Sequence, residues 1–201
     1  MGTIADFITK VIPAFLVVTL FSLPGTVEAQ GFVSCSGTGC SLCDFASMGN
    51  NHFLAQPSSI AFSSNGNFAT VHETDDFTQG PPPTGSPEDF MGPTLWSSDP
   101  DIVDGGHGGH LDMLHNSPNG MGVAWEEDNT FWVFDGYHSS ITRYAFHGDH
   151  GPGGADHSDG VLRRYVEGEV ERESDVPSHM ELDHDSGLLY IADTGNRRIA
   201  V

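Results

Sequence analysis

Basic residues are scarce in this chain of 201 residues, which has 7 lysines and arginines against 28 aspartates and glutamates and a net charge of −21. Lys10 is the only lysine, so every later basic residue is an arginine. A surface this acidic repels phosphate backbones and anionic membranes. We therefore expect no nucleic-acid partner, and we consider two reasons for the acidity, which are solubility and cation binding.

Long apolar runs are also scarce, and the sequence has one, from Val11 to Leu23. A run of about 13 residues matches a signal-peptide core and is short for a membrane-spanning helix. Val27-Glu28-Ala29 then has the small-x-small pattern of a cleavage site. We predict a signal peptide over residues 1–29, with an uncleaved anchor as the alternative. The mature chain is then secreted, periplasmic or extracellular, without a membrane span.

Cysteine occurs three times, at Cys35, Cys40 and Cys43, within a segment (residues 30–55) that we predict to precede the main domain. Export permits disulfide bonds. The spacing allows one local disulfide with one remaining thiol. A zinc knuckle is the alternative, and its fourth ligand would be His52.

Several catalytic signatures are absent from the sequence. It has no Gly-x-Ser-x-Gly, no phosphate-binding glycine-rich loop and no His-Glu-x-x-His. It also has no stretch with the Ala, Leu, Glu and Lys texture of a long helix. The 25 glycines, 12 prolines and 13 phenylalanines favour turns and strands. These features indicate an all-β chain and give no support to a hydrolase triad.

The main domain, residues 56–201, contains three similar stretches, which begin at Pro57, Pro118 and Pro177. Each has a proline, a short apolar strand, a turn of Asn, Asp or Gly, a second apolar strand and an acidic residue. A fixed spacing, here about sixty residues, is typical of stacked supersecondary units. A β-sandwich is the alternative, because short alternating strands occur there too.

The third stretch contains Gly-Leu-Leu-Tyr-Ile-Ala-Asp-Thr-Gly-Asn-Arg-Arg-Ile (residues 187–199) and closely resembles the NHL repeat. The second stretch is a good match to this repeat, and the first is a weak one. The resemblance implies that each repeat forms a four-stranded blade of a β-propeller. A closed propeller has about four to eight blades. The predicted fold is therefore all-β, an incomplete NHL-type β-propeller with about two to three blades.

Propeller topology sorts the polar residues onto two faces, because successive strands alternate in direction. One face, here called the proline face, receives the loop before each proline-led strand and the turn after the second strand. Its candidate metal ligands and catalytic residue are His115, Tyr137, His138 and His179. Asp135 also lies there, and an aspartate before such a turn commonly caps it. Imidazoles suit zinc and carboxylates suit calcium, so either ion is a candidate.

The densest polar cluster runs from His147 to Asp159, and the same topology places it on the opposite face. Its candidate zinc or calcium ligands are His147, Asp149, His150, His157 and Asp159. A solvated polar loop is the alternative. His107, His110 and Asp112 form a second, weaker cluster, which precedes the repeat that begins at Pro118.

One family with NHL-type blades performs chemistry on the proline face, the peptidyl-hydroxyglycine lyase of peptide-amidating enzymes. Asp135-Gly136-Tyr137 resembles its Asp-Gly-Tyr turn, which implies that Tyr137 is catalytic. Val176-Pro177-Ser178-His179 resembles its zinc-ligand segment with histidine and serine exchanged in order.

Two functions follow from the sequence. The first is an exported binding or scaffolding module that recognises a protein, peptide or glycan on its proline face, with or without a bound metal. The alternative is a metal-dependent lyase in which the metal polarises an oxygen and Tyr137 acts as general base.

Overall fold

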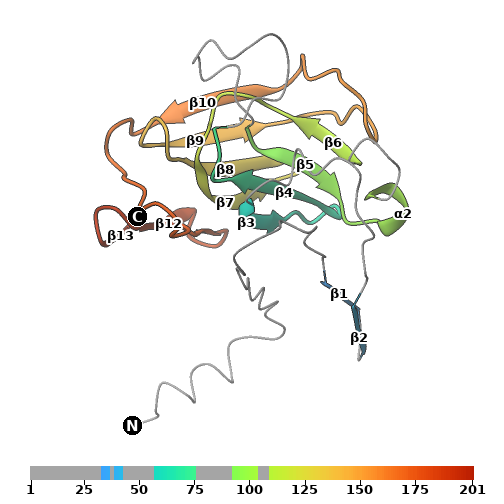
Figure 1. The fold of residues 1–201 in the computed structure, drawn as a ribbon, viewed down its shortest axis with the longest axis horizontal. Coiled ribbons are helices and arrows are strands. Elements are labelled where there is room, and N and C mark those ends of the chain that lie inside the picture. Colours follow the sequence, from blue (N-terminus) through green and yellow to red (C-terminus); the bar gives the residue numbers. More distant parts are fainter. Residues whose placement is uncertain (1–32, 37–38, 43–56, 76–91, 104–108) are drawn as a thin grey trace, which may run out of the picture. The chain divides into compact units, whose positions relative to one another are not determined.

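A computed structural model describes residues 33–36, 39–42, 57–75, 92–103 and 109–201 (Figure 1). The predicted signal peptide, Cys43, His52 and His107 lie outside these residues. Among the described residues, no helix is long and apolar enough to cross a membrane.

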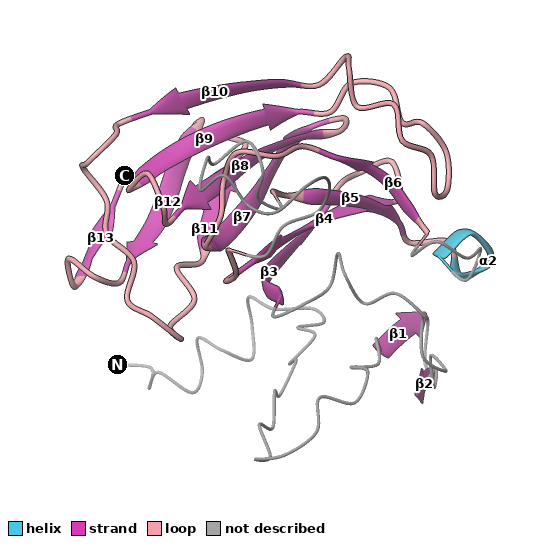
Figure 2. Cartoon of the chain, turned by 45° about the horizontal axis from the view of Figure 1, so that its top comes forward, coloured by secondary structure: helices cyan, strands magenta, loops and turns pink. Residues whose placement is uncertain are grey.

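Three antiparallel sheets follow one another along the chain (Figure 2). The first sheet has strands β3 (Pro57–Phe62), β4 (Asn67–His72), β5 (Thr94–Ser97) and β6 (His110–Met113). The second sheet has strands β7 (Gly120–Glu127), β8 (Thr130–Asp135), β9 (Ser140–Ala145) and β10 (Val161–Tyr165). The third sheet has strands β11 (Met180–Asp183), β12 (Leu188–Asp193) and β13 (Arg198–Ala200). In each sheet, every strand pairs with the strand that follows it in the sequence.

Two small elements complete the described part of the chain. Helix α2 (Pro100–Val103) lies between β5 and β6 in the sequence. Strands β1 (Val33–Ser36) and β2 (Gly39–Leu42) form a hairpin whose register pairs Cys35 with Cys40. The prediction of an all-β fold is confirmed for the described residues, while the incomplete propeller, its NHL type and the disulfide stay predictions.

The first strands of the three sheets lie next to one another, since β7 contacts both β3 and β11. Hydrogen bonds join them: the Val123 N–H donates to Ser59 Oγ at 3.3 Å, and the Ser178 N–H donates to Met121 O at 2.9 Å. Pro57 begins β3, and Pro118 and Pro177 come shortly before β7 and β11. The proline-led segments therefore form a contiguous series, as the repeat predicts.

The second sheet separates two hydrophobic cores. Along β8, Phe131 and Val133 belong to the core shared with the first sheet, whereas Phe134 belongs to the core shared with the third. Side chains of a strand point alternately to its two faces, so a strand covered on both faces must be apolar at successive positions. This is why Phe-Trp-Val-Phe is a continuous apolar run instead of an alternating one.

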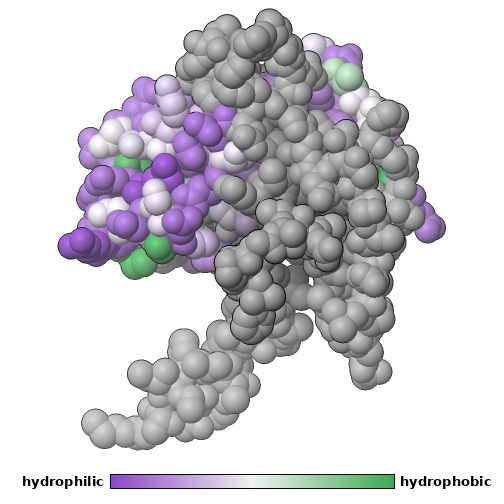
Figure 3. Space-filling view, viewed as in Figure 1, coloured by the Kyte–Doolittle hydropathy of each residue, from purple (hydrophilic) through white to green (hydrophobic). Residues whose placement is uncertain are grey.

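The third sheet buries less apolar surface. Tyr190 is 41% exposed and Ile199 is 68% exposed, whereas Phe131 and Phe134 are fully buried. The described surface seen in Figure 3 is mostly hydrophilic, with isolated apolar residues. That surface agrees with the excess of acidic side chains in the sequence.

Candidate metal centre

The loop between β9 and β10 (residues 146–160) extends from the second sheet to the outermost strand of the first. The His150 N–H donates to Leu111 O and the Gly153 N–H donates to His110 O, both at 3.0 Å. Strand β6 is the last strand of its sheet, so this side would otherwise present unpaired backbone groups. The β9–β10 loop thus covers part of the free edge of β6.

Three histidines meet where this loop contacts β6. His110 begins β6, and His150 and His157 come from the β9–β10 loop. Their candidate ligand nitrogens all lie within 4.8 Å of one another, and together they could hold a metal ion. The ring centroid of His150 lies 5.0 Å from that of His110 and 4.9 Å from that of His157.

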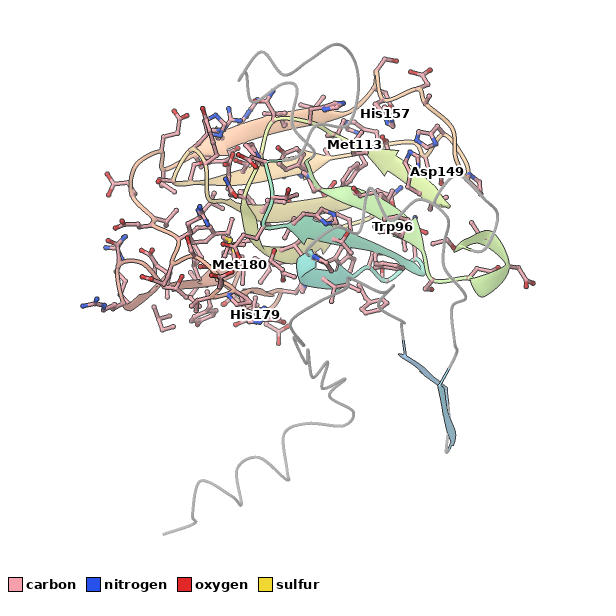
Figure 4. All side chains as sticks on the ribbon, viewed as in Figure 1. Trp96, Met113, Asp149, His157, His179 and Met180 are labelled. Carbon is pink, nitrogen blue, oxygen red and sulfur yellow. The ribbon has the colours of Figure 1, made fainter. Side chains whose placement is uncertain are left out.

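The site lies away from the third sheet. In Figure 4, His157 and Asp149 lie near Met113 of β6 at one end of the described sheets, far from His179 beside β11. Within the described residues, these three histidines form the group of potential metal ligands that lie close enough together to share one ion.

The backbone of the loop fixes the tautomer of His150. Its Nδ1 lies 2.6 Å from Gly151 O, which can only accept a hydrogen bond, so Nδ1 carries the hydrogen. The lone pair is then on Nε2, which is buried and has no hydrogen-bond partner. His150 therefore turns Nε2 toward the site, and a hydrogen bond to Gly151 O holds the other side of the ring.

A carboxylate performs the same task for His157. Its Nδ1 lies 2.7 Å from Asp112 Oδ1. The Met113 N–H lies 2.6 Å from the same oxygen and 3.3 Å from His157 Nδ1, so its shorter contact is with the carboxylate. Nδ1 of His157 therefore donates to Asp112 and leaves Nε2 for a ligand. A carboxylate behind a histidine in this way is the usual support of a zinc ligand.

Asp112 is an unusual buried carboxylate. Its side chain is 0% exposed, and its second oxygen, Oδ2, has no hydrogen-bond partner. Burial raises the pKa of Asp112, and the hydrogen bonds from His157 and Met113 lower it only in part. Among the described ion pairs, its partner is His157 alone. A cation bound to His157 would supply the positive charge that this carboxylate lacks.

Close packing of the loop also holds the His150 ring. A Cβ atom on Gly154 would lie 2.5 Å from His150 Nδ1 and 2.8 Å from its carbonyl oxygen. Only glycine leaves room for the imidazole at this point. The Gly-rich composition of the loop is thus part of the geometry of the site.

The other predicted loop ligands have different surroundings, and metal binding by them stays a prediction. His147, Asp149 and Asp159 are exposed. Asp149 Oδ1 accepts a hydrogen bond from the Gly151 N–H, and Asp159 Oδ2 accepts one from the Gly148 N–H, both at 3.0 Å. These contacts shape the loop, and the three side chains are outside the three-histidine group.

The residues predicted on the proline face surround a different buried carboxylate. Asp135 is 0% exposed and accepts hydrogen bonds from the backbone N–H groups of Tyr137 and His138 at 3.2 and 3.0 Å. Its Oδ2 also lies 2.8 Å from His138 Nδ1 and 3.3 Å from Arg164 Nε. The expected capping of this turn is therefore observed.

The other residues of the proline face differ in how much of each side chain is exposed to solvent. Tyr137 is 49% exposed, with its ring centroid 4.9 Å from that of His138. His115 is partly buried, and His179 is exposed while its neighbour Ser178 is buried and lies 2.7 Å from Thr194 Oγ1. Metal binding by His115, His138 and His179 and catalysis by Tyr137 stay predictions.

Comparisons with known proteins add little to this picture. No family model and no curated protein matches the chain. Among solved structures, an auxiliary nutrient binding protein from Bacteroides ovatus is similar, with a TM-score of 0.44 and 16% identity, over 73% of this chain and 31% of that one. This chain thus spans about a third of that protein, and a likeness at this level indicates nothing about function. The fold and the site define an all-β protein with a candidate three-histidine metal centre.

Proposed function

We propose that this chain belongs to an exported binding protein of the NHL β-propeller type, and that it holds a zinc ion at His110, His150 and His157. The proposal depends on the hydrogen bonds that orient the two loop histidines, His150 and His157. Each has Nδ1 engaged by an oxygen acceptor, Gly151 O or Asp112 Oδ1. Both rings therefore offer Nε2 for coordination before any metal arrives.

The ligand set favours zinc over calcium. Calcium takes oxygen ligands, whereas imidazole nitrogen is a common zinc ligand. Zinc–nitrogen bonds of about 2.1 Å in a tetrahedral site place the ligand nitrogens roughly 3.4 Å apart. The nitrogens lie within 4.8 Å of one another. Closure by up to about 1.4 Å, through small movements of the β9–β10 loop, would complete the coordination.

The binding-module part of the proposal is supported by the series of proline-led strands. β3, β7 and β11 lie in sequence order beside one another, which is the arrangement expected of successive blades. The apolar run and small-x-small pattern at the N-terminus support export. The proposed ligand of the proline face is a protein, peptide or glycan.

Zinc binding to variants of the purified full-length chain tests the proposal and separates it from the lyase alternative. Isothermal titration calorimetry of the wild type should show one tight zinc site and no tight calcium site. His157→Ala should abolish tight binding, whereas His184→Ala, an exposed histidine beside Trp125, should retain it. Loss of zinc in His179→Ala with retention in His157→Ala would overturn the assignment and point to the proline face.

A further inference from the structure

We propose that the metal ion acts as a clasp between the first and second sheets, by fixing the β9–β10 loop on β6. This inference rests on the proposed zinc site, and it assigns the ion a structural task there. The ligands come from two segments: β6 provides His110, and the loop of the second sheet provides His150 and His157. An ion held by all three cross-links the two sheets.

Polar contacts, rather than buried apolar side chains, hold the loop in place. None of its residues from 147 to 160 is buried, whereas all four residues of β6 are. Segments with few buried apolar contacts open locally at low free-energy cost. Two backbone hydrogen bonds, the contacts of His157 with Asp112 and Met113, and the ring contacts of His110 connect the loop to β6. The metal would therefore be its strongest attachment.

Asp112 links the ion to the strand as well as to the loop. It sits on β6, and its Oδ1 receives hydrogen bonds from His157 and from the Met113 N–H, across a separation of 45 positions in the first case. Its second oxygen is buried without a partner. A buried carboxylate is stabilised by a nearby positive charge. Asp112 is thus a positioning residue, which orients His157 and compensates the charge of the ion.

The edge of β6 explains why such a clasp is useful. An uncovered edge strand presents backbone groups that can pair with another chain. The loop covers this edge at His110 and Leu111, where it donates two N–H groups. With the ion bound, the edge stays covered. Without the ion, the loop opens more often and the edge is exposed.

Hydrogen exchange of the full-length chain with and without zinc tests the clasp. The amides of His150 and Gly153 donate to β6 and report loop opening directly. At free zinc of 100 times the dissociation constant, their exchange should slow by up to about 100-fold, because zinc binds the closed state. The Ala192 amide, which donates to His179 O in the third sheet, should exchange at an unchanged rate.

The outcomes separate the two proposals. Zinc binding by calorimetry with unchanged exchange at His150 and Gly153 would overturn the clasp and leave the zinc site standing. Absence of tight zinc binding would overturn both. Asp112→Asn keeps the shape of the side chain and should weaken zinc binding by about 10- to 100-fold with a smaller slowing of exchange. If this variant does not fold, His150→Ala, which removes a ligand at a partly exposed position, should abolish both tight zinc binding and the slowing of exchange at Gly153.

Discussion

Two buried aspartates of this chain each hold a histidine, and their surroundings differ. Asp112 and Asp135 are both 0% exposed, and each has an oxygen within 2.7 or 2.8 Å of Nδ1 of its histidine, His157 or His138. One pair lies where the β9–β10 loop meets β6. The other lies in the turn between β8 and β9, on the predicted proline face.

The difference is in how the negative charge is compensated. Asp135 receives hydrogen bonds from two backbone N–H groups, from Ser117 Oγ at 2.7 Å and from Arg164 Nε at 3.3 Å. Asp112 receives one backbone N–H, has no arginine or lysine in its described ion pairs, and keeps one oxygen without a partner. The fold itself satisfies the carboxylate of Asp135, whereas Asp112 keeps an unpartnered oxygen that the proposed cation at His157 would help to compensate.

The largest effect on the free energy of unfolding should come from removing the carboxylate of Asp135. Asp135→Ala leaves Arg164 Nε and four other hydrogen-bond donors, from Ser117, Tyr137 and His138, without this acceptor in the interior of the second sheet. Breaking a buried pair in this way typically costs about 3–5 kcal/mol. Urea denaturation should show this loss in the free energy of unfolding. In metal-free protein, Asp112→Asn should cost less than about 1.5 kcal/mol, and equal losses would contradict the comparison.

The zinc affinity should respond in the opposite order. Asp112→Asn removes the charge behind His157 and should weaken zinc binding by about 10- to 100-fold. Asp135→Asn, the matched change at the other pair, should leave zinc affinity within about twofold, because Asp135 has no contact with the three histidines. Competition with a chromophoric chelator measures both constants. A similar weakening in the two variants would remove the distinction between the sites.

Asp193 extends the comparison to the third sheet. Burial raises its pKa, but hydrogen bonds from the Glu171 N–H, Asn196 and Arg198 more than offset this and hold the pKa below its usual 3.8. A lowered folded-state pKa means that the ionised side chain stabilises the fold above the unfolded pKa, and that this stability is lost as the pH falls through the folded pKa. Asp193→Asn should thus cost about 1–2 kcal/mol at pH 7 and less below about pH 4. Denaturation at both pH values checks this, and a pH-independent cost would refute it.

The smallest effect should come from the glycine beside His150. The methyl group of Gly154→Ala would meet the His150 ring, so the imidazole must shift. We expect zinc affinity to fall by less than about tenfold, since the loop is exposed and can adjust. Gly148→Ala is the control in the same loop, because its Cβ would lie 3.4 Å from Asp159 Oδ2. Equal effects of the two changes would show that the contact with His150 is unimportant.

Much of the fold follows from local patterns in the sequence. Composition and the proline-led repeat together predict the all-β class, and the structure places β3, β7 and β11 beside one another as the repeat predicts. The capping role of Asp135 was also expected, because an aspartate before a Gly turn accepts its N–H groups within a few residues. These features depend on contacts that are close in sequence or repeated at a fixed spacing.

The metal centre could be predicted only in part. The loop histidines His150 and His157 were candidates, but His110 was assigned to a separate, weaker cluster. The three histidines meet because backbone hydrogen bonds hold the β9–β10 loop against β6. Such bonds do not depend on side-chain type, so the sequence pattern does not reveal them. One signal was available: His110 and Asp112 are two positions apart in a short strand, and alternation predicts the same face for both.

Anomalous diffraction at the zinc absorption edge, from zinc-soaked crystals of the full-length chain, tests the central claim most directly. The account predicts a zinc peak between the imidazoles of His110, His150 and His157, with Asp112 behind His157. A peak on the proline face beside His115, His138 or His179 with none between those three imidazoles, or no peak at all, would contradict it.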